Sequence, residues 1–433
     1  TEYVFQHVDG WLIFIGSLVL ANFLAGVYRV QYSFSHFNLV VAWVFSLVFS
    51  LLVLGVTSFA WLGHLLGRGV LFWTILFYAF FSITTRLFAF KWIFSGRKFT
   101  VRTVIVGAGK TAHSMKKLIE NEYTFPRHRL VAYVNVGVSG QRGSDSAYVS
   151  ADGVDVLSAD EKTFGDVIRT ADAGLVIIGL DNMADAGKLY RHMRSLRYEG
   201  IEVISALSAY EIYSGKVPLD LADEEYLMLI SMESMLPMLR QVKRFIDIAV
   251  SVAGIIIFSL PAILISIVIK LSDIFSPVLY FQERAGLFGK RFTMYKFRTM
   301  KPEAEKESGP VWSAAGDRRV TVFGRFLRQF RLDEIPQLWN ILKGDMSIVG
   351  PRPERPELLA EMEQRIPFFG ERLNVPPGLT GWAQVRYPYG STVEDAKRKL
   401  EFDLYYIKNL SLALDLQVIL QTVRIVLFGK ERG

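Results

Sequence analysis

The chain has 433 residues, of which 51% are hydrophobic and 21% are charged, and its net charge is +7. This composition is more apolar than that of an ordinary soluble protein, and it predicts segments embedded in a membrane. The lack of cysteine excludes disulfides, zinc–thiolate sites and cysteine nucleophiles. The positive charge suits anionic lipid or small phosphates, and since the sequence contains no RNA- or DNA-binding motif, no nucleic-acid partner is expected.

Three apolar runs open the sequence, at residues 11–27, 37–62 and 70–90. Each is close to the ~20 residues that a helix needs to cross ~30 Å of hydrocarbon. Basic residues cluster at the end of the third run, which predicts that this end is cytoplasmic. Three spans would then leave Thr1 outside, so we expect a further span before Thr1, giving four in the full protein.

From Val101 to Leu207 the pattern alternates between strands and helices, which predicts a small doubly wound α/β domain, Rossmann-like in class. Its first turn, Gly107 to Ala112, is a G-x-G-x-x-A variant of the dinucleotide fingerprint. It is not a P-loop, because Val104 stands where that motif requires glycine. No acid ends the second strand near Asn135 to hold a ribose. A structural or ligand-sensing role is therefore favoured over bound NAD.

A longer apolar run at residues 243–270 contains Pro261, which removes one helical hydrogen bond and clashes with the carbonyl of Ile257. Ser259 is near enough to satisfy a freed backbone group. Basic residues flank both ends, so the positive-inside rule places both in the cytoplasm. We expect a re-entrant helix that enters the membrane, bends and returns. The alternative is an ordinary kinked transmembrane helix, which would put the two soluble domains on opposite sides.

The last apolar run, residues 410–428, is interrupted by polar residues and predicts an interfacial helix rather than a full span. The predicted architecture is a transmembrane helical bundle, a Rossmann-like α/β domain with a linker, and a C-terminal α+β domain. The expected boundaries are residues 1–98, 99–240 and 241–433.

The stretch "RLDEIPQLWN" sets Asp333 and Glu334 side by side. Pro336 favours an extended Ile335 and suits the first position of a helix over residues 336–342. The acids would then precede a helix N-terminus, where an anion is stabilised. Simple helix capping by these acids is the plainer reading of this stretch alone.

Several arginines precede the two acids in the sequence, and Arg352 follows them. Arg352 is held between Pro351 and Pro353, and a fixed guanidinium suits bidentate contacts with phosphate or a nucleobase. Each arginine alone is readily explained as a solvated surface charge, but the set indicates an anionic partner. Five of them fall within 14 residues: Arg318, Arg319, Arg325, Arg328 and Arg331.

Six motifs, in order over residues 242–409, resemble the monotopic phosphoglycosyl transferases, the bacterial sugar transferases that start cell-surface glycan assembly. The leading spans and α/β domain resemble the large subclass of that family. One departure is Arg331, where relatives commonly have a small polar residue. The motifs are "KRFID", the "SLP" break, "YKFRTM", "LDEIPQLWNILKGDMSIVGPRP", "PGLTGWAQV" and "FDLYYIKN".

The resemblance implies transfer of a hexose-1-phosphate from a UDP-sugar to undecaprenyl phosphate, giving undecaprenyl-diphospho-sugar and UMP. Galactose-1-phosphate is expected, with glucose-1-phosphate the alternative, as the first membrane step of O-antigen, capsule or exopolysaccharide synthesis. A carboxylate ~4 Å from a phosphate is repelled by about 4 kcal/mol at an effective dielectric of 20. That repulsion calls for a cation, and Mg²⁺ is the expected cofactor.

The resemblance also implies roles. Asp333 is the nucleophile that forms a covalent phosphosugar–aspartyl intermediate, and Glu334 handles metal or protons; both are candidate Mg²⁺ ligands. The residues alone do not choose between the two acids as nucleophile. Trp382 and Gln384 are read as core residues rather than nucleotide contacts. Six basic residues are candidates for binding substrate phosphates or the nucleotide: Arg328, Arg352, Lys296, Arg298, Arg325 and Arg318.

Two other classes of function compete with this one. A membrane-anchored nucleotide-sugar oxidoreductase or epimerase would use NAD in the α/β domain, which lacks both the ribose acid and a Tyr-x-x-x-Lys pair. A non-enzymatic scaffold would tolerate loss of Asp333. The expected location is the bacterial inner membrane with the catalytic domain on the cytoplasmic face, and a homodimer is expected by analogy.

Overall fold

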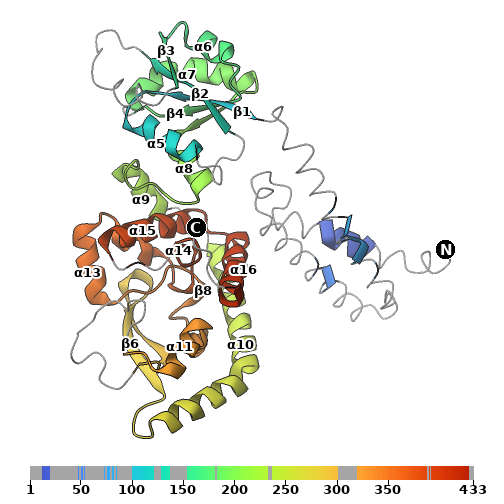
Figure 1. The fold of residues 1–433 in the computed structure, drawn as a ribbon, viewed down its shortest axis with the longest axis vertical. Helices are drawn as coiled ribbons and strands as arrows, with labels where there is room; N and C mark the ends of the chain where they lie inside the picture. Colours follow the sequence, from blue (N-terminus) through green and yellow to red (C-terminus); the bar gives the residue numbers. More distant parts are fainter. Residues whose placement is uncertain are drawn as a thin grey trace, which may run out of the picture. The chain divides into compact units, whose positions relative to one another are not determined.

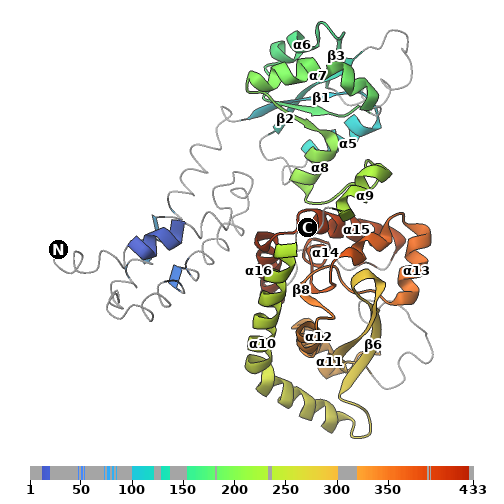
Figure 2. The ribbon, with the colours of Figure 1, turned by 180° about the vertical axis from the view of Figure 1, so that it is seen from behind.

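The computed structural model is shown from opposite sides in Figures 1 and 2. The chain divides into two compact units, Thr1–Ala209 and Tyr210–Gly433, and each is described by itself. The described residues are 12–19, 100–120, 128–136, 154–180, 183–232, 237–300, 319–387, 390 and 392–428, with isolated helical positions and two- or three-residue helical stretches between 47 and 84.

The predicted N-terminal spans fall mostly outside the described residues. Residues 12–19, inside the first apolar run, are helical, with Phe14 and Leu18 buried. The number of spans, their orientation and the expected span before Thr1 stay predictions.

A five-stranded parallel sheet forms the α/β domain of the first unit, as predicted, with strand order β3-β2-β1-β4-β5. Strand β3 was not expected, because "DVLSA" alternates poorly and buries only its last residue. The strands are β1 (Val101–Val106), β2 (His128–Val136), β3 (Asp155–Ala159), β4 (Leu175–Ile178) and β5 (Glu202–Ser205). The helices between them are α5 (Lys110–Ile119), α6 (Phe164–Thr170) and α7 (Met183–Tyr198).

Alternate residues of the sheet face two sets of helices. Val104 and Val176 pack with Phe164 of α6 and Leu189 of α7 in one apolar cluster, and Figure 1 shows α6 and α7 on one face of the sheet with α5 on the other. This is the two-sided burial that makes the strands of a parallel sheet continuously apolar.

The glycine turn after β1 has a packing reason. Gly107 has a φ of +118°, and a Cβ there would lie 2.5 Å from the carbonyl oxygen of Gly179 at the end of β4. Only glycine permits this approach. The first glycine of the G-x-G-x-x-A pattern is therefore accounted for by the close fit between the turn and the neighbouring strand end.

Helix α10 (Pro237–Ser272) contains the predicted re-entrant segment and is the one described helix long and apolar enough to cross a membrane. Pro261 lies inside it, and Figures 1 and 2 show the helix bending partway along its length. The Ser259 hydroxyl donates to the carbonyl of Ile256 at 2.8 Å. A proline and a serine–backbone bond are recognised causes of helix bending.

Three charged residues near the start of α10 each reach a different element of the second unit. The Lys243 ammonium lies 2.5 Å from the Asp415 carboxylate. Arg244 donates to the last backbone carbonyls of α12 (Gln337–Lys343), at 2.5 and 2.7 Å. Asp247 accepts from a hydroxyl and a backbone N–H of β8 (Ser347–Val349), at 3.1 and 2.9 Å. The "KRFID" motif thus anchors α10 to the domain.

The rest of the second unit is a mixed domain built around one apolar core. Strands β6 (Leu279–Ala285) and β7 (Arg291–Phe297) form an antiparallel hairpin, and β8 pairs in parallel with β9 (Gly378–Thr380). Helix α8 (Ala206–Ser214) contains the boundary between the two units. The other helices of the second unit are α9 (Glu224–Met232), α11 (Val322–Gln329), α13 (Pro356–Arg365), α14 (Trp382–Arg386), α15 (Val393–Lys408) and α16 (Leu412–Phe428), with short 3₁₀ turns η5 (Leu287–Gly289), η6 (Leu332–Glu334) and η7 (Phe369–Asn374).

The predicted interfacial helix corresponds to α16, and one of its faces belongs to the domain core. Leu414 and Val418 are buried in that core, and Asp415 accepts from the Tyr406 hydroxyl at 2.6 Å besides its contact with Lys243. Asp415, one of the polar residues that interrupt this apolar run, is thus an internal ion-pair partner rather than a lipid-surface contact.

Replacing Lys243 with methionine should lower the free energy of unfolding by about 3–5 kcal/mol, because Asp415 then stays buried without its cation. Urea unfolding of the full chain in detergent micelles would measure the loss. Lys397→Met is the matched control, since its partner Asp220 is 76% exposed and an exposed pair contributes under about 1 kcal/mol. Equal losses in the two variants would contradict the anchoring role.

Candidate active site

The acid pair lies in a short turn between two helices. Helix α11 begins at the cap residue Thr321, whose hydroxyl accepts from the N–H of Gly324 at 2.9 Å. After α11 ends, Arg331 takes a left-handed conformation with φ 53° and the chain enters η6. Arg331 therefore leaves the face of α11 on which a three-residue spacing would place it.

The extended conformation predicted for Ile335 is wrong. Ile335 is helical, with φ −50° and ψ −43°, and its N–H bonds the carbonyl of Leu332 at 3.3 Å. Its side chain packs against the buried apolar clusters. Tertiary packing thus overrides the local preference imposed by Pro336, and η6 runs directly into α12.

Glu334 is buried and surrounded by positive charge. Its carboxylate lies 3.2 Å from the Lys296 ammonium of β7, 3.3 Å from the Arg352 guanidinium and 3.5 Å from that of Arg331. Burial alone raises the pKa of Glu334, but Lys296, Arg352 and Arg331 outweigh it and hold that pKa at about 2. Glu334 is therefore a fixed negative charge at the centre of the cation cluster.

Asp333 is equally buried, at 8% exposed, but differs chemically from its neighbour. Burial and then the charge of Glu334 raise its pKa, against the opposing effect of Lys296, Arg328 and Arg352. Among the described residues, no hydrogen bond or ion pair reaches its carboxylate. Its lone pairs are therefore open to a cation or to an electrophile.

The other predicted site residues separate into two groups. Lys296 and Arg352 contact Glu334, while Arg328 is near enough for its charge to oppose the raised pKa of Asp333, and its Nε donates to the Thr299 hydroxyl at 2.9 Å. Arg298 instead forms an ion pair with Asp273 at 3.3 Å. Two other candidates make no described contact with the acids: Arg325 is exposed on α11, and Arg318 lies outside the described residues.

Sequence reasoning missed Arg284 and Arg372 at this site. The Arg284 guanidinium, on β6, donates to the carbonyl of Pro353 at 3.1 Å, and burial lowers its pKa to about 10. Both arginines approach the loop that carries Arg352. In the sequence, Arg284 is one of the basic residues that follow the apolar run, a position that by itself indicates topology rather than a role at the site. Trp382 is a core residue, as predicted, and its indole N–H donates to the carbonyl of Gly215 at 2.7 Å.

The described residues include no group of three or more His, Asp or Glu side chains placed to enclose a metal ion. A divalent cation here would take one or two protein carboxylates and complete its shell with substrate phosphates and water, which is the usual arrangement for Mg²⁺. Asp333 fits this use, because its lone pairs are open. Glu334 fits it less well, since three cations already contact its two oxygens.

The candidate site is thus a buried acid pair ringed by lysine and arginine, in a domain that carries an apolar bent helix. Residues 238–429 match the family model of the bacterial sugar transferases. The chain belongs to this family.

Curated relatives agree with this assignment. The chain is 37% identical over 246 residues to UDP-N-acetylgalactosamine-undecaprenyl-phosphate N-acetylgalactosaminephosphotransferase of Aeromonas hydrophila, covering 56% of each chain. It is 44% identical over 146 residues to a putative undecaprenyl-phosphate N-acetylgalactosaminyl 1-phosphate transferase of Bacillus subtilis, covering 34% of this chain and 78% of that one. It is 41% identical over 185 residues to UDP-glucose:undecaprenyl-phosphate glucose-1-phosphate transferase of Caulobacter vibrioides, covering 42% and 68%. The chain thus spans about half the length of the Aeromonas protein.

Asp333→Asn and Glu334→Gln should differ in their effect on the free energy of unfolding at pH 7, with a loss expected for Glu334→Gln alone. The folded state lowers the pKa of Glu334 from its ordinary 4.5 to about 2. The ionised carboxylate therefore stabilises the fold at every pH above 4.5, and this contribution is lost as the pH falls toward 2. Glu334→Gln should therefore cost roughly 3 kcal/mol, since it leaves three cations without their counter-charge. The raised pKa of Asp333 means that the fold disfavours its charge, so Asp333→Asn should be neutral or stabilising.

Urea unfolding of both variants at pH 7 measures this difference. A larger loss in Asp333→Asn than in Glu334→Gln would contradict the assignment of Glu334 as the structural charge of the pair.

Proposed function

We propose that the chain transfers a sugar-1-phosphate from a UDP-sugar to undecaprenyl phosphate and releases UMP. The observation that carries the proposal is the division within the acid pair: Asp333 has an open carboxylate, while Glu334 is neutralised by three cations. The names of the relatives support the two substrates. Those relatives are named for N-acetylgalactosamine and glucose, and galactose, the hexose expected from the sequence, stays a prediction.

The proposed chemistry has two displacements at one phosphorus atom. An oxygen of Asp333 attacks the sugar-bearing phosphorus, and the bond from that phosphorus to the bridging oxygen breaks, so that UMP leaves with the electron pair. An oxygen of the lipid phosphate then attacks the same phosphorus and breaks its bond to Asp333. The carboxylate is regenerated and undecaprenyl-diphospho-sugar is formed. Covalent catalysis of this kind lets a soluble donor and a lipid acceptor use one site in turn.

The cations around the acids fit the charge that such a transfer develops. Arg328 and Arg352 are proposed to bind the donor phosphates and nucleotide, in the way guanidinium groups recognise phosphate. The Lys296 ammonium is proposed to interact with both the Glu334 carboxylate and the reacting phosphate. Bound Mg²⁺ would offset the repulsion between Asp333 and the donor phosphates, with Asp333 as its protein ligand.

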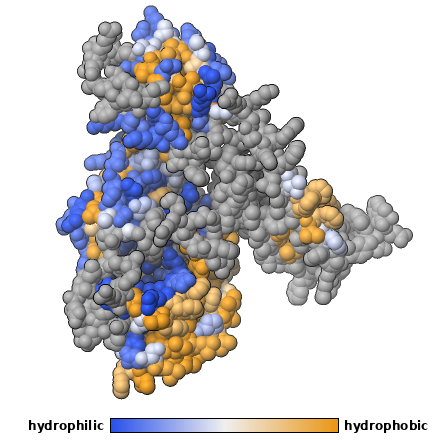
Figure 3. All heavy atoms as spheres, in the orientation of Figure 1, coloured by the Kyte–Doolittle hydropathy of each residue, from blue (hydrophilic) through white to orange (hydrophobic). Residues whose placement is uncertain are grey.

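The apolar surface of α10 supports a location at the membrane. Ile256 and Ile257 are each 68% exposed and Phe275 is 99% exposed, and Figure 3 shows apolar side chains gathered over the bent end of this helix. Val322, Phe326 and Phe330 add an apolar stripe at four-residue spacing from the start of α11 to the residue that follows it. We propose that α10 is re-entrant from the cytoplasmic face, with α11 at the lipid surface beside the acids.

A membrane-anchored nucleotide-sugar oxidoreductase or epimerase remains the second candidate. Its sequence motif is the glycine turn after β1, and the fit of Gly107 against Gly179 explains the first glycine of that turn without a nucleotide. A non-enzymatic scaffold would leave the buried cation cluster without a purpose. The homodimer expected by analogy is part of the proposal.

Purified full chain with Mg²⁺ should release UMP when given undecaprenyl phosphate and one of UDP-galactose, UDP-N-acetylgalactosamine or UDP-glucose. Asp333→Asn should lower that rate by at least ~10³-fold, because a residue that carries the covalent step cannot be bypassed. Lys397→Met, a surface substitution, is the folded control. A stoichiometric burst of UMP without lipid would support the covalent intermediate. Release of no UMP from any of the three donors, or full activity in Asp333→Asn, would refute the proposal.

The topology of α10 is open to cysteine labelling, since the chain has no cysteine of its own. Met238 lies in the first turn of α10 and Phe275 lies three residues past its end, and they are 77% and 99% exposed. A membrane-impermeant maleimide should label Met238→Cys and Phe275→Cys from the cytoplasmic side in inverted vesicles, and neither in intact spheroplasts. Labelling of one position in each preparation would instead establish a spanning helix.

A further inference from the structure

The loop that carries Arg352 is held by its backbone carbonyls. Four consecutive carbonyls each accept a hydrogen bond from a different group outside the loop. The pairs are Pro351 with the N–H of Gly378 at 2.8 Å, Arg352 with Nη2 of Arg372 at 3.2 Å, Pro353 with Nη1 of Arg284 at 3.1 Å, and Glu354 with the N–H of Ala285 at 3.0 Å.

The composition of this loop explains why carbonyls do the anchoring. Pro351 and Pro353 have no N–H to donate, and their rings restrict the backbone on either side of Arg352. The loop entrance is equally tight, because a Cβ on Gly350 would lie 2.3 Å from the carbonyl oxygen of Pro376. The direction of the Arg352 side chain is therefore set by whatever holds this backbone.

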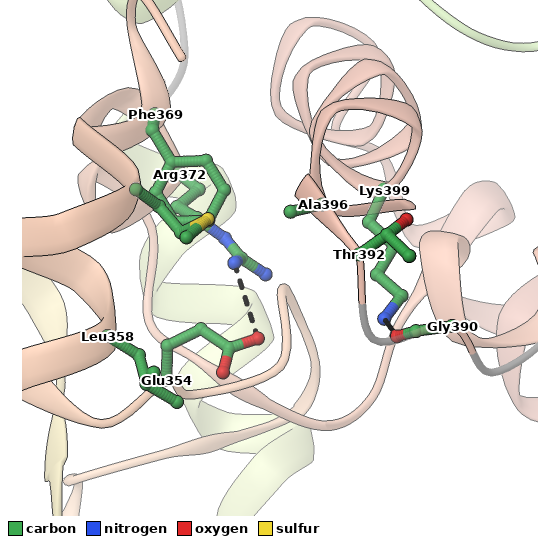
Figure 4. Close-up of a pocket in the computed structure, with 9 residues that line it drawn as sticks. Glu354, Leu358, Phe369, Arg372, Gly390, Thr392, Ala396 and Lys399 are labelled. Carbon is green, nitrogen blue, oxygen red and sulfur yellow. Dashed lines mark hydrogen bonds and ion pairs between the residues drawn. The ribbon is translucent and has the colours of Figure 1, made fainter. Parts of the chain in front are cut away.

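Arg372 of η7 is the buried side chain that bonds the Arg352 carbonyl itself. It is 5% exposed, and the same Nη2 atom lies 2.7 Å from the carboxylate of Asp403, which is 1% exposed on α15. Its Nη1 atom lies 3.5 Å from the carboxylate of Glu354. Figure 4 shows Arg372 and Glu354 joined on one side of a pocket, with Lys399 of α15 on the other.

These contacts make a continuous path to the acids. Asp403 orients Arg372, Arg372 holds the backbone of Arg352, and the Arg352 guanidinium meets Glu334 at 3.3 and 3.4 Å. Charge-assisted hydrogen bonds of this kind are stronger and more directional than neutral ones. A small shift of the loop backbone would move the Arg352 guanidinium away from both Glu334 and a bound phosphate.

We propose that Arg372, oriented by Asp403, is a positioning residue that sets the place of Arg352 for binding the UDP-sugar donor. The inference rests on the proposed function and extends it to a residue that touches neither acid. Arg372 has no contact with Asp333 or Glu334 among the described residues, so its effect passes through Arg352.

The test separates positioning from simple stability by a double-mutant cycle. In the full chain, Arg372→Met should lower kcat/KM for the UDP-sugar about 100-fold, the scale expected for a misplaced binding group. Arg372→Lys should recover part of that loss, since an ammonium can keep one of the contacts. In an Arg352→Ala background, Arg372→Met should add less than about 3-fold, because coupled residues are not additive.

Glu401→Gln is the matched control. Glu401 lies two residues before Asp403 on α15 and pairs with Lys216 at 3.0 Å, and it contacts the linker rather than the Arg352 loop. Its kcat/KM should stay within about 3-fold of wild type even where its thermal stability falls. Thermal unfolding of every variant identifies any that fails to fold, in which case Arg372→Lys and Asp403→Asn complete the comparison.

Fully additive effects of Arg372→Met and Arg352→Ala in an active enzyme would overturn the positioning role and leave the proposed function standing. Equal kinetic losses in Glu401→Gln and the Arg372 variants would overturn it in the same way. A wild-type chain that turns over none of the three UDP-sugars would overturn the proposed function and this inference together.

Discussion

One buried negative charge organises the catalytic domain. An isolated carboxylate at the depth of Glu334 would cost several kcal/mol, and the fold offsets that cost by bringing cations from three separate places to it. Lys296 comes from a strand of the hairpin, Arg331 from the turn after α11, and Arg352 from the loop after β8. Because those cations converge on Glu334, the adjoining Asp333 is left with open lone pairs in a strongly positive surrounding. Two chemically identical groups thus acquire different properties from their neighbours alone.

Holding three cations in place requires rigid supports, and the structure provides them mainly through backbone contacts. Asn340 of α12 accepts from the N–H of Tyr295 and donates to the carbonyl of Thr293, which fixes β7, and with it Lys296, against α12. The loop of Arg352 is fixed through its carbonyls, and Arg331 is turned toward Glu334 by its left-handed conformation. The site therefore depends on elements that are distant in sequence and make no contact with the reacting atoms.

Features carried by short contiguous motifs were predictable. The acid pair, Arg352 between its prolines and the parallel sheet all follow from local pattern, and the comparisons agree with the family resemblance. Arg298 shows the limit of such reasoning: it stands two residues after Lys296, but β7 has already ended, so strand alternation no longer aligns the two side chains. The conformation of Ile335 was set by packing that no local rule contains. The ion pair of Arg372 and Asp403 joins positions 31 residues apart. Asp403 lies in the "FDLYYIKN" motif but Arg372 lies outside all six motifs, so no local pattern predicts their contact.

The distribution of charged residues along α10 determines whether the catalytic domain can be truncated to a water-soluble form. The charged anchoring contacts of α10 described above lie in its first three turns, and 22 consecutive uncharged residues separate Asp247 from Lys270. The chain nevertheless returns from the far end of this helix into the hairpin that supplies Lys296. The apolar segment of α10 is thus an insertion within the catalytic domain rather than an extension at its edge. Trimming it away to obtain a water-soluble enzyme would remove the residues of α10 that pack against Phe297 of the hairpin, and it would cut the link between the anchored start of α10 and β6.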